Sequence, residues 1–389
     1  MSTGQVFNQQ PTGNLQHVIF GAESAFEVAT DLSSHKLLKF DSFSATRSRE
    51  DFLANHKRTT LDMLTDAWVQ GKEGAAWQFS QDLRPSGAAG TAPDIANILK
   101  AAGLAETVNG GTDVQYDPAN AISTTLNIVE DLETYSQRIR GGLVTAIRIK
   151  LPEGNNPAKL EAEGIGTSVI RTGYDVTTGI TAGSATTIPV TELGHFEVGG
   201  FVQIGTDTNT AVGFRITAKS AATGAGNLTI HSGLTSGEAS GVTVAPYATT
   251  PTAVGDIAPI ISGTTQIDST AIKVLSGELA INNEIATDLE VVGQDRIQVY
   301  RITSREILYS MQCLLRRDDL LAMKPVGVTT LNVDVTIGDT AGKKITIDVP
   351  TWQVDIPEIE VPESGLIPVT LSGRALGSSG DDSFKITFD

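Results

Sequence analysis

Two short segments of this 389-residue chain come close to known ligand-binding motifs. Gly338–Lys344 (GDTAGKK) is similar to a phosphate-binding loop, but it has one residue too few between its glycines. Lys344 also occupies the place of the Ser or Thr that would bind Mg²⁺. The run Asp207, Thr208, Asn209 has the oxygen ligands that begin a calcium loop, without the ligands that should follow. Both segments are typical of turns between strands.

The remaining reactive residue types form no pattern that indicates catalysis. Cys313 lies in an apolar run (MQCLL), which favours a small buried side chain over a reactive thiolate. The acid pairs Asp318–Asp319 and Asp381–Asp382 fit a helix start and a turn. No G-x-S-x-G elbow and no H-E-x-x-H spacing occur among the dispersed histidines, which are His17, His35, His56, His195 and His231. We therefore predict no catalytic, cofactor-binding or metal-binding residues, no cofactor, and a protein that is not an enzyme.

Composition favours a mainly β protein without a membrane-spanning segment. Aromatic residues are 5% of the chain and glycines number 39, a mixture that suits many short strands joined by tight turns. The net charge of −17 argues against a protein that reads DNA sequence, which needs cations to neutralise phosphates. No apolar stretch is long enough to cross a bilayer, and no secretory signal is recognisable. We expect synthesis in a reducing cytoplasm.

One helix organises the expected fold, between Arg84 and Pro118. Thr91 is its candidate N-cap, and Pro93 lies in the first turn, where a missing N–H costs nothing. Gly103 supplies a left-handed stop after an apolar stripe at helical spacing, which consists of Ile95, Ile98, Leu99 and Ala102. A lone helix with one apolar stripe must pack on a sheet.

The segment that contains this helix carries a family resemblance. TAPDIANILKAAGLAET and GTDVQYDPA resemble the helix and following strand of the tail tube proteins of long-tailed, siphovirus-like bacteriophages. The closing segment, Ser364–Asp389, resembles the final strands of the same family. Together the similar parts cover Lys36–Ser168 and Thr265–Asp389. The resemblance implies a structural virion protein and includes no catalytic signature.

Composition and resemblance together divide the chain into four parts. Residues 1–34 are expected to be an N-terminal arm, 35–170 a first tube domain, and 251–389 a second tube domain. Residues 171–250, rich in Thr, Gly, Ala and Val, are expected to form a small inserted all-β decoration domain, Ig-like or similar. The predicted fold is thus a duplicated β-sandwich that can form a barrel, with one short helix in each copy. The second helix is expected at 316–323 (RRDDLLAM), closed by Pro325.

Several strands are predicted from alternation. Trp77 and Phe79 mark one strand, and a clean core pattern is formed by Val114, Tyr116, Leu126 and Ile128. LNVDVTIGDTAGKKITIDV is expected to be a hairpin with its turn at Gly338–Lys343. Residues 37–45 (LLKFDSFSA) are expected to form a strand, and the charged, poorly periodic stretch 46–74 that follows is expected to be a long excursion between strands. By resemblance, Asp41–Gly74 would be the loop that contacts the next ring of a tube, and the alternative is a solvated loop.

An offset of 211 residues relates the two halves. It aligns Gly154 with Gly365, Pro157 with Pro368, Leu160 with Leu371, Gly166 with Gly377 and Ser168 with Ser379. This indicates a duplicated tube domain, so that three copies would complete a pseudo-six-fold ring. Without duplication, six copies would be needed.

The sequence therefore favours a major tail tube subunit that self-assembles into stacked rings and forms a conduit for genome delivery. Its expected partners are itself, the tape measure protein and genomic DNA in the lumen, and tail terminator and baseplate proteins at the tube ends. The expected location is the virion tail, assembled in the bacterial cytoplasm. The alternative is a β-rich module that binds carbohydrate or a receptor, as in a tail fibre or adhesin.

Overall fold

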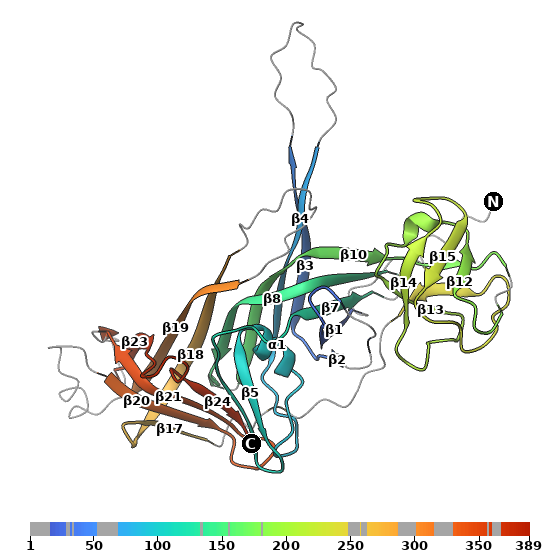
Figure 1. Ribbon diagram of the computed structural model, residues 1–389. Coiled ribbons are helices and arrows are strands. Elements are labelled where there is room, and N and C mark those ends of the chain that lie inside the picture. Colours follow the sequence, from blue (N-terminus) through green and yellow to red (C-terminus); the bar gives the residue numbers. More distant parts are fainter. Residues whose placement is uncertain are drawn as a thin grey trace, which may run out of the picture.

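The chain is mainly β in the computed structural model, as its composition predicts, and every described strand pairing is antiparallel (Figure 1). The described strands form one sheet of 18 strands and one of six. The structure describes residues 16–28, 32, 35–52, 69–132, 135–154, 156–179, 182–247, 257, 263–286, 301–314, 330–355, 358–359 and 367–389.

The large sheet takes strands from both ends of the chain. Its first half consists of β1 (His17–Ala22), β2 (Lys36–Leu37), β3 (Ser42–Phe52), β4 (Val69–Asp82), β5 (Leu104–Asn109), β6 (Asp113–Pro118), β7 (Leu126–Asp131), β8 (Ser136–Lys150), β9 (Lys159–Gly166) and β10 (Ser168–Thr172). Its second half consists of β17 (Gly263–Ile267), β18 (Thr270–Ala286), β19 (Arg301–Leu314), β20 (Thr330–Ile337), β21 (Ile345–Val354), β22 (Glu358–Ile359), β23 (Val369–Ala375) and β24 (Lys385–Phe388).

The two halves of the large sheet repeat one pairing pattern. In the first half β1 pairs with β7, β7 with β8, β8 with both β9 and β10, β9 with β4, and β4 with β3. In the second half β17, β20, β21, β23, β24, β19 and β18 pair in the same way, in the same order along the chain. Seven strands therefore correspond one to one, and the fold is duplicated. The 211-residue offset places β9 on β23 and Leu160 on Leu371, which are both buried.

Helix α1 (Ala96–Ala101) packs between β1, β7 and β8 on the buried side of the sheet. Its apolar stripe is the predicted one, and Gly103 ends it with a φ of 78°. The predicted cap is wrong, because the helix begins after Ile95 and no side chain caps it. Thr91 therefore lies in the loop before the helix, where tertiary packing has shortened the helix from its N-terminal end. The second expected helix, residues 316–323, lies outside the described residues.

Two strand pairings join the halves, β8 with β18 and β6 with β24. β8 of the first half pairs with β18 of the second, from Lys150 opposite Glu278 to Ala146 opposite Asn282. Arg305 of the second half donates to the carbonyl oxygens of Gly103 (2.9 Å) and Ala119 (3.2 Å), just beyond the C-terminal end of α1. A cation is favourable at this negative end of the helix dipole. The junction is therefore held by backbone pairing and by a cation at the helix end.

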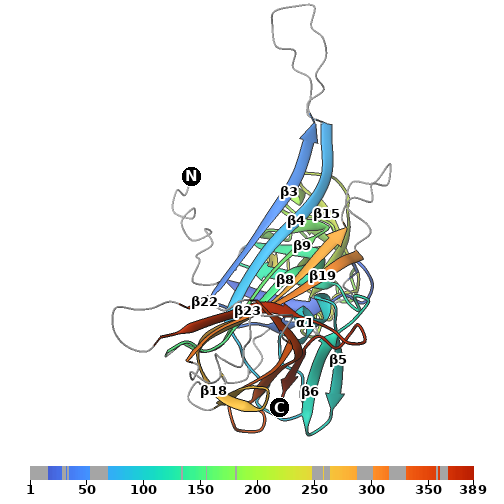
Figure 2. The same ribbon diagram turned by 90° about the vertical axis from the view of Figure 1, so that its left-hand side faces the viewer.

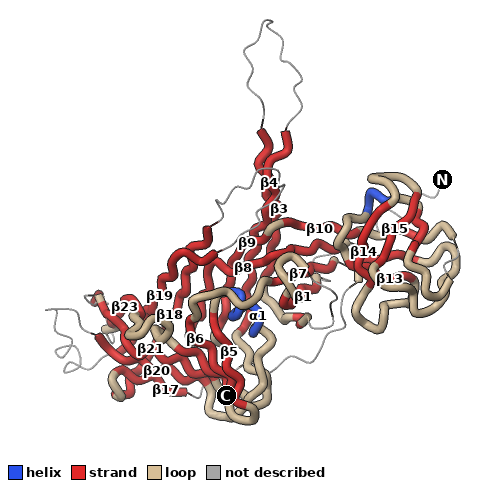
Figure 3. Tube along the Cα trace, in the orientation of Figure 1, coloured by secondary structure: helices blue, strands red, loops and turns tan. Residues whose placement is uncertain are grey.

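The second sheet lies within the chain segment between β10 and β17. It consists of β11 (Asp175–Val176), β12 (Thr187–Val190), β13 (Phe201–Ile204), β14 (Phe214–Lys219), β15 (Gly226–Ile230) and β16 (Thr243–Pro246), with a 3-10 turn at Leu193–His195. It has its own apolar core, in which Phe196 and Phe214 are fully buried. This unit lies at one end of the molecule, beyond β10 (Figure 3).

Two predictions about the first 75 residues need correction. His17–Ala22 is strand β1, with Phe20 buried against Trp77 and Phe79, so this part of the expected arm belongs to the sheet. In the stretch Asp41–Gly74 the described residues 42–52 and 69–74 are strand rather than loop, since they belong to β3 and β4, which pair and project from the body (Figure 2). Its polar face is solvent-exposed, so charged residues there produce no apolar alternation. Residues 53–68 lie outside the described residues.

Substituting Arg305 by Ala should weaken the junction of the halves. We expect the free energy of unfolding to fall by about 2 kcal/mol, because carbonyl groups beyond α1 lose a charged donor. Urea unfolding followed by Trp fluorescence would measure this. Arg301→Ala, at an exposed position on the same strand, should change the value by less than about 0.5 kcal/mol. Equal effects of the two substitutions would contradict the assigned role.

Candidate assembly surface

Eight strands of the large sheet form a half-barrel, in the order β3, β4, β9, β8, β18, β19, β23, β21. The order contains the same four-strand unit twice, with the β8 to β18 pairing between the units. Side chains on the buried side include Trp77, Leu160, Ile147 and Ile281, which pack with α1 into one core. The opposite side is exposed to solvent, and it is the candidate assembly surface.

That solvent side, which we term the polar face, is defined by strand alternation and register. One row runs from Ser80 to Glu161 to Arg148, each directly opposite the next on neighbouring strands. All members of the face are partly or fully exposed. They include Ser42, Ser44, Thr46, Gln78, Ser80, Asp82, Arg148, Lys150, Lys159, Glu161, Glu163, Glu278, Asn282, Glu284, Glu306, Ser310, Gln312, Asp355, Thr370, Ser372 and Arg374. The face therefore carries hydroxyl, amide and charged groups.

Carboxylates outnumber cations on the polar face. Its carboxylates are those of Asp82, Glu161, Glu163, Glu278, Glu284, Glu306 and Asp355, and its cations are Arg148, Lys150, Lys159 and Arg374. Lys150 lies 2.5 Å from Glu161, and Arg374 lies 2.9 Å from Glu306. Two of the cations of this face are thus held by its carboxylates.

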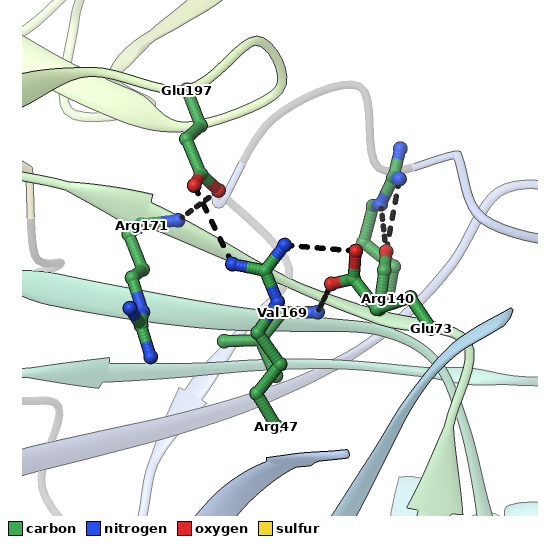
Figure 4. A network of polar contacts seen from close by, with 7 residues as sticks. Arg47, Glu73, Arg140, Val169, Arg171 and Glu197 are labelled. Carbon is green, nitrogen blue, oxygen red and sulfur yellow. Dashed lines mark hydrogen bonds and ion pairs between the residues drawn. The ribbon is translucent and has the colours of Figure 1, made fainter. Parts of the chain in front are cut away.

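The edge of β10 is closed by side chains (Figure 4) and, near Arg171 and Thr172, by the backbone of residues 195–197. The backbone N–H of Val169 donates to Glu73 at 3.2 Å, and that of Arg171 donates to Glu197 at 2.9 Å. Arg47 of β3 links the two carboxylates, at 2.9 Å from Glu73 and 3.8 Å from Glu197. These carboxylates occupy outward N–H groups that another strand would otherwise use, a known defence against edge-to-edge aggregation.

The corresponding edge in the second half is closed differently. There β24, the counterpart of β10, pairs with β6, and Ile386 lies opposite Tyr116. The β5–β6 hairpin of the first half thus covers the edge of the second half. Fifteen residues separate β19 from β20, against 43 between β4 and β7 in the first half, so the second half has less chain from which to build such a hairpin. The carboxylate closure of β10 replaces it.

Two edges of the half-barrel remain without a strand partner in the described part of the chain. β3 pairs with β4 alone. At the other end, β20 accompanies β21 only as far as Gln353, and the residues that follow pair on one side only, with β23. These are the two ends of the eight-strand order, and each is a row of backbone groups able to bind another strand.

The inserted unit is attached through a buried cation. Arg138 of β8 is 3% exposed, donates to the carbonyl oxygen of Gly199 at 2.5 Å, and lies 5.2 Å from the centre of the Phe201 ring. Burial lowers the pKa of Arg138 to about 9, which leaves it charged at neutral pH. An apolar cluster that includes Ile19, Val129 and Tyr247 surrounds this contact.

The residues that suggested chemistry in the sequence have structural roles. Gly338–Lys343 is the turn of the predicted hairpin, and Ile337 pairs with Ile345 across it. Asp207 accepts hydrogen bonds from Thr235 and Ser236. Burial would raise its pKa, but these bonds outweigh burial and lower it. Burial raises the pKa of Cys313 to about 11.

The other candidate residues are not brought together. His17, His35, His195 and His231 lie on different elements, while His56 and Asp318–Asp319 lie outside the described residues. Asp382 closes a turn by accepting from Ser378 and Ser379. Within the described ranges no group of three or more His, Cys, Asp or Glu residues could hold a metal ion. No helix there is long and apolar enough to span a membrane.

No protein-family model matches the chain, and no curated protein matches it. Any functional proposal therefore depends on the sheet, its edges and the sequence resemblance.

Replacing both Glu73 and Glu197 by Ala should open the edge of β10. The amide protons of Val169 and Arg171 would then exchange about tenfold faster, the effect of losing one hydrogen bond of about 1.4 kcal/mol. Hydrogen exchange of a peptide covering residues 168–172 would measure this. The matched control, Glu163→Ala with Glu306→Ala, removes two carboxylates from the polar face and should leave this exchange unchanged. Equal exchange in both variants would contradict the closure.

Proposed function

We propose that this chain is a subunit of a self-assembling tube, the major tail tube protein of a long-tailed bacteriophage. The observation that carries the proposal is the repeated four-strand unit. Its two copies already pair edge to edge in one half-barrel and leave complementary edges, that of β3 (the counterpart of β18) at one end and that of β21 (the counterpart of β8) at the other. Repeating the β8 to β18 junction between copies would satisfy both edges, which otherwise invite aggregation.

The strand count supports an open conduit. Eight strands in each of three copies would give a closed ring of 24. Closed barrels of about 16–18 strands already leave an aqueous channel, so a ring of 24 would leave a wider one. Three chains would suffice because each contributes two units, whereas six would double the number of strands.

The polar face would line that channel, and its composition suits passage of DNA without adhesion. Small hydroxyl and amide side chains offer weak contacts, and carboxylates pair with Lys150 and Arg374. Few unpaired cations would remain to neutralise phosphates, which is the main source of affinity for DNA. The tape measure protein would occupy the same space before ejection. Tail terminator and baseplate proteins would close the two ends of the tube in the virion.

The β3–β4 hairpin is suited to join successive rings. It projects from the body, and Arg47 connects its base to Glu197 of the inserted unit (Figures 1 and 4). The inserted unit, attached beyond β10, would then decorate the outside of the tube. Stacking of rings would follow from contacts of this hairpin with the next ring.

Electron microscopy of the purified chain over a concentration series would test the proposal. We expect hollow tubes or stacked rings whose outline has six-fold appearance with three-fold modulation. The physical reason is that unpaired edges are satisfied only on closure. Monodisperse single chains at every concentration, in the presence of a purified tail initiator complex, would contradict the proposal.

Reversing charge on the polar face should make the conduit bind DNA. Glu163→Lys with Glu278→Lys adds cations where phosphates would pass, and binding should weaken steeply with salt, since each phosphate contact contributes a slope of about 0.9. Retention of duplex DNA by assembled tubes, measured against salt concentration, would show this. The control, Asp339→Lys with Asp381→Lys, makes the same change of charge at exposed turns elsewhere. Equal retention by both variants would contradict the assignment of this face to the lumen.

A further inference from the structure

We infer the register in which two copies of this chain pair: Ser44 of one copy lies opposite Asp355 of the next. The inference rests on the proposed function for its setting. Its content comes from the internal junction, where β18 pairs with β8 in a register that the structure gives residue by residue. Within the chain, β8 of the first half pairs with β18 of the second half. Between copies, the counterpart of β8 in the second half would pair in the same way with the counterpart of β18 in the first half of the next copy.

The counterpart of β18 is β3, and their registers can be matched through their hairpin partners. Across β18 and β19, Glu278 lies opposite Ser310, and Ala280 lies opposite Leu308. Across β3 and β4, Ser42 lies opposite Ser80, and Ser44 lies opposite Gln78. β4 then pairs with β9, where Ser80 lies opposite Glu161. In the same way β19 pairs with β23, the counterpart of β9, where Ser310 lies opposite Ser372.

The 211-residue offset maps Glu161 onto Ser372 and so completes the match. Ser310 therefore corresponds to Ser80, and Glu278 to Ser42. Two residues further along, Ala280 corresponds to Ser44.

The counterpart of the β8 segment lies at the end of β21. Arg148 lies opposite Glu161 of β9, and the equivalent of Glu161 in β23 is Ser372. The backbone N–H of Asp355 donates to the carbonyl oxygen of Ser372 at 2.8 Å, so Asp355 stands where Arg148 stands in the first half. Since Arg148 lies opposite Ala280 within the chain, Asp355 should lie opposite Ser44 between copies.

The structure also limits the extent of this pairing. Gln353 already pairs with Thr330 of β20 on the side where a new strand would add, so pairing with the next copy starts at Val354. Val354 would face Ala45. Glu358 lies opposite Thr370, which corresponds to Lys159, the residue opposite Lys150, so the register shifts by one residue after Asp355 and the backbone of Glu358 would face Ser42. Each of these residues is in the described part of the chain, and Ser44 and Asp355 are both exposed. The partner of this edge is therefore a second copy of the same chain.

The double variant Ser44→Cys with Asp355→Cys tests the register in the full-length chain. Directly opposed residues of antiparallel strands have Cα atoms about 4.5–5.5 Å apart, within the range that a disulfide spans. Within one chain the two positions lie at opposite ends of eight strands, roughly 30 Å apart at about 4.8 Å per strand, and cannot react. With an added oxidant, assembled protein should give covalent species that end at the closed trimer on a denaturing gel.

Three controls make the result decisive. Ala280→Cys with Arg148→Cys places the same pair at the internal junction and should form a disulfide within single chains. Ser48→Cys with Asp355→Cys shifts the register by four residues, about 13 Å, and should not cross-link. The parent chain, whose one thiol is the buried Cys313, should give no covalent species.

The outcomes separate this inference from the proposed function. Rings seen by electron microscopy without cross-linking of the Ser44 and Asp355 variant, or with cross-linking of the Ser48 variant instead, would overturn the register and leave the tube proposal standing. Failure of both assembly and cross-linking, while the internal pair still forms its disulfide, would overturn both. Cross-linking of the Ser44 and Asp355 variant to trimers and no further supports both.

Discussion

Backbone groups at sheet edges must be paired, and this requirement accounts for much of the architecture. Each half of the large sheet has one outer edge, on β10 or β24, and two half-barrel edges. The outer edge of β24 is covered by the β5–β6 hairpin, and that of β10 by the carboxylates of Glu73 and Glu197. The half-barrel edges of β8 and β18 pair with each other. Within the described part of the half-barrel, the edges of β3 and of the end of β21 are left, and in the proposed ring they would pair between copies.

The duplication of the fold determines which edges of the large sheet can pair with each other. Because seven strands recur with the same pairings, the contact between the halves would also be the template for the proposed contact between copies. Arg305 adds a hydrogen bond from the second half to the end of α1 in the first. The inserted unit follows β10 in the chain and does not separate paired strands of the large sheet. It is held against the sheet through Arg138 and the apolar residues around it.

Sequence patterns predicted the parts of this fold that local chemistry determines. Buried strands with strict alternation, such as the one with Val114 and Tyr116, and the hairpin around Gly338 were predictable, and so were the helical stripe and its Gly103 stop. The strand was predicted to end at residue 45, and its continuation over residues 46–52 was not predictable, because one side of β3 is exposed and its residues are charged or small. The closure of the β10 edge could not be predicted from the sequence, because Arg47, Glu73 and Glu197 meet only through the tertiary fold.

The number of chains in the smallest closed assembly tests the central claim most directly, since repetition of one junction in every chain requires a fixed number. Native mass spectrometry of assembled protein, gently dissociated into rings, would count them. Each chain has a mass of 40.9 kDa. The account predicts rings of three chains, each supplying two four-strand units. Rings of six chains, or closed assemblies with no preferred number, would contradict it.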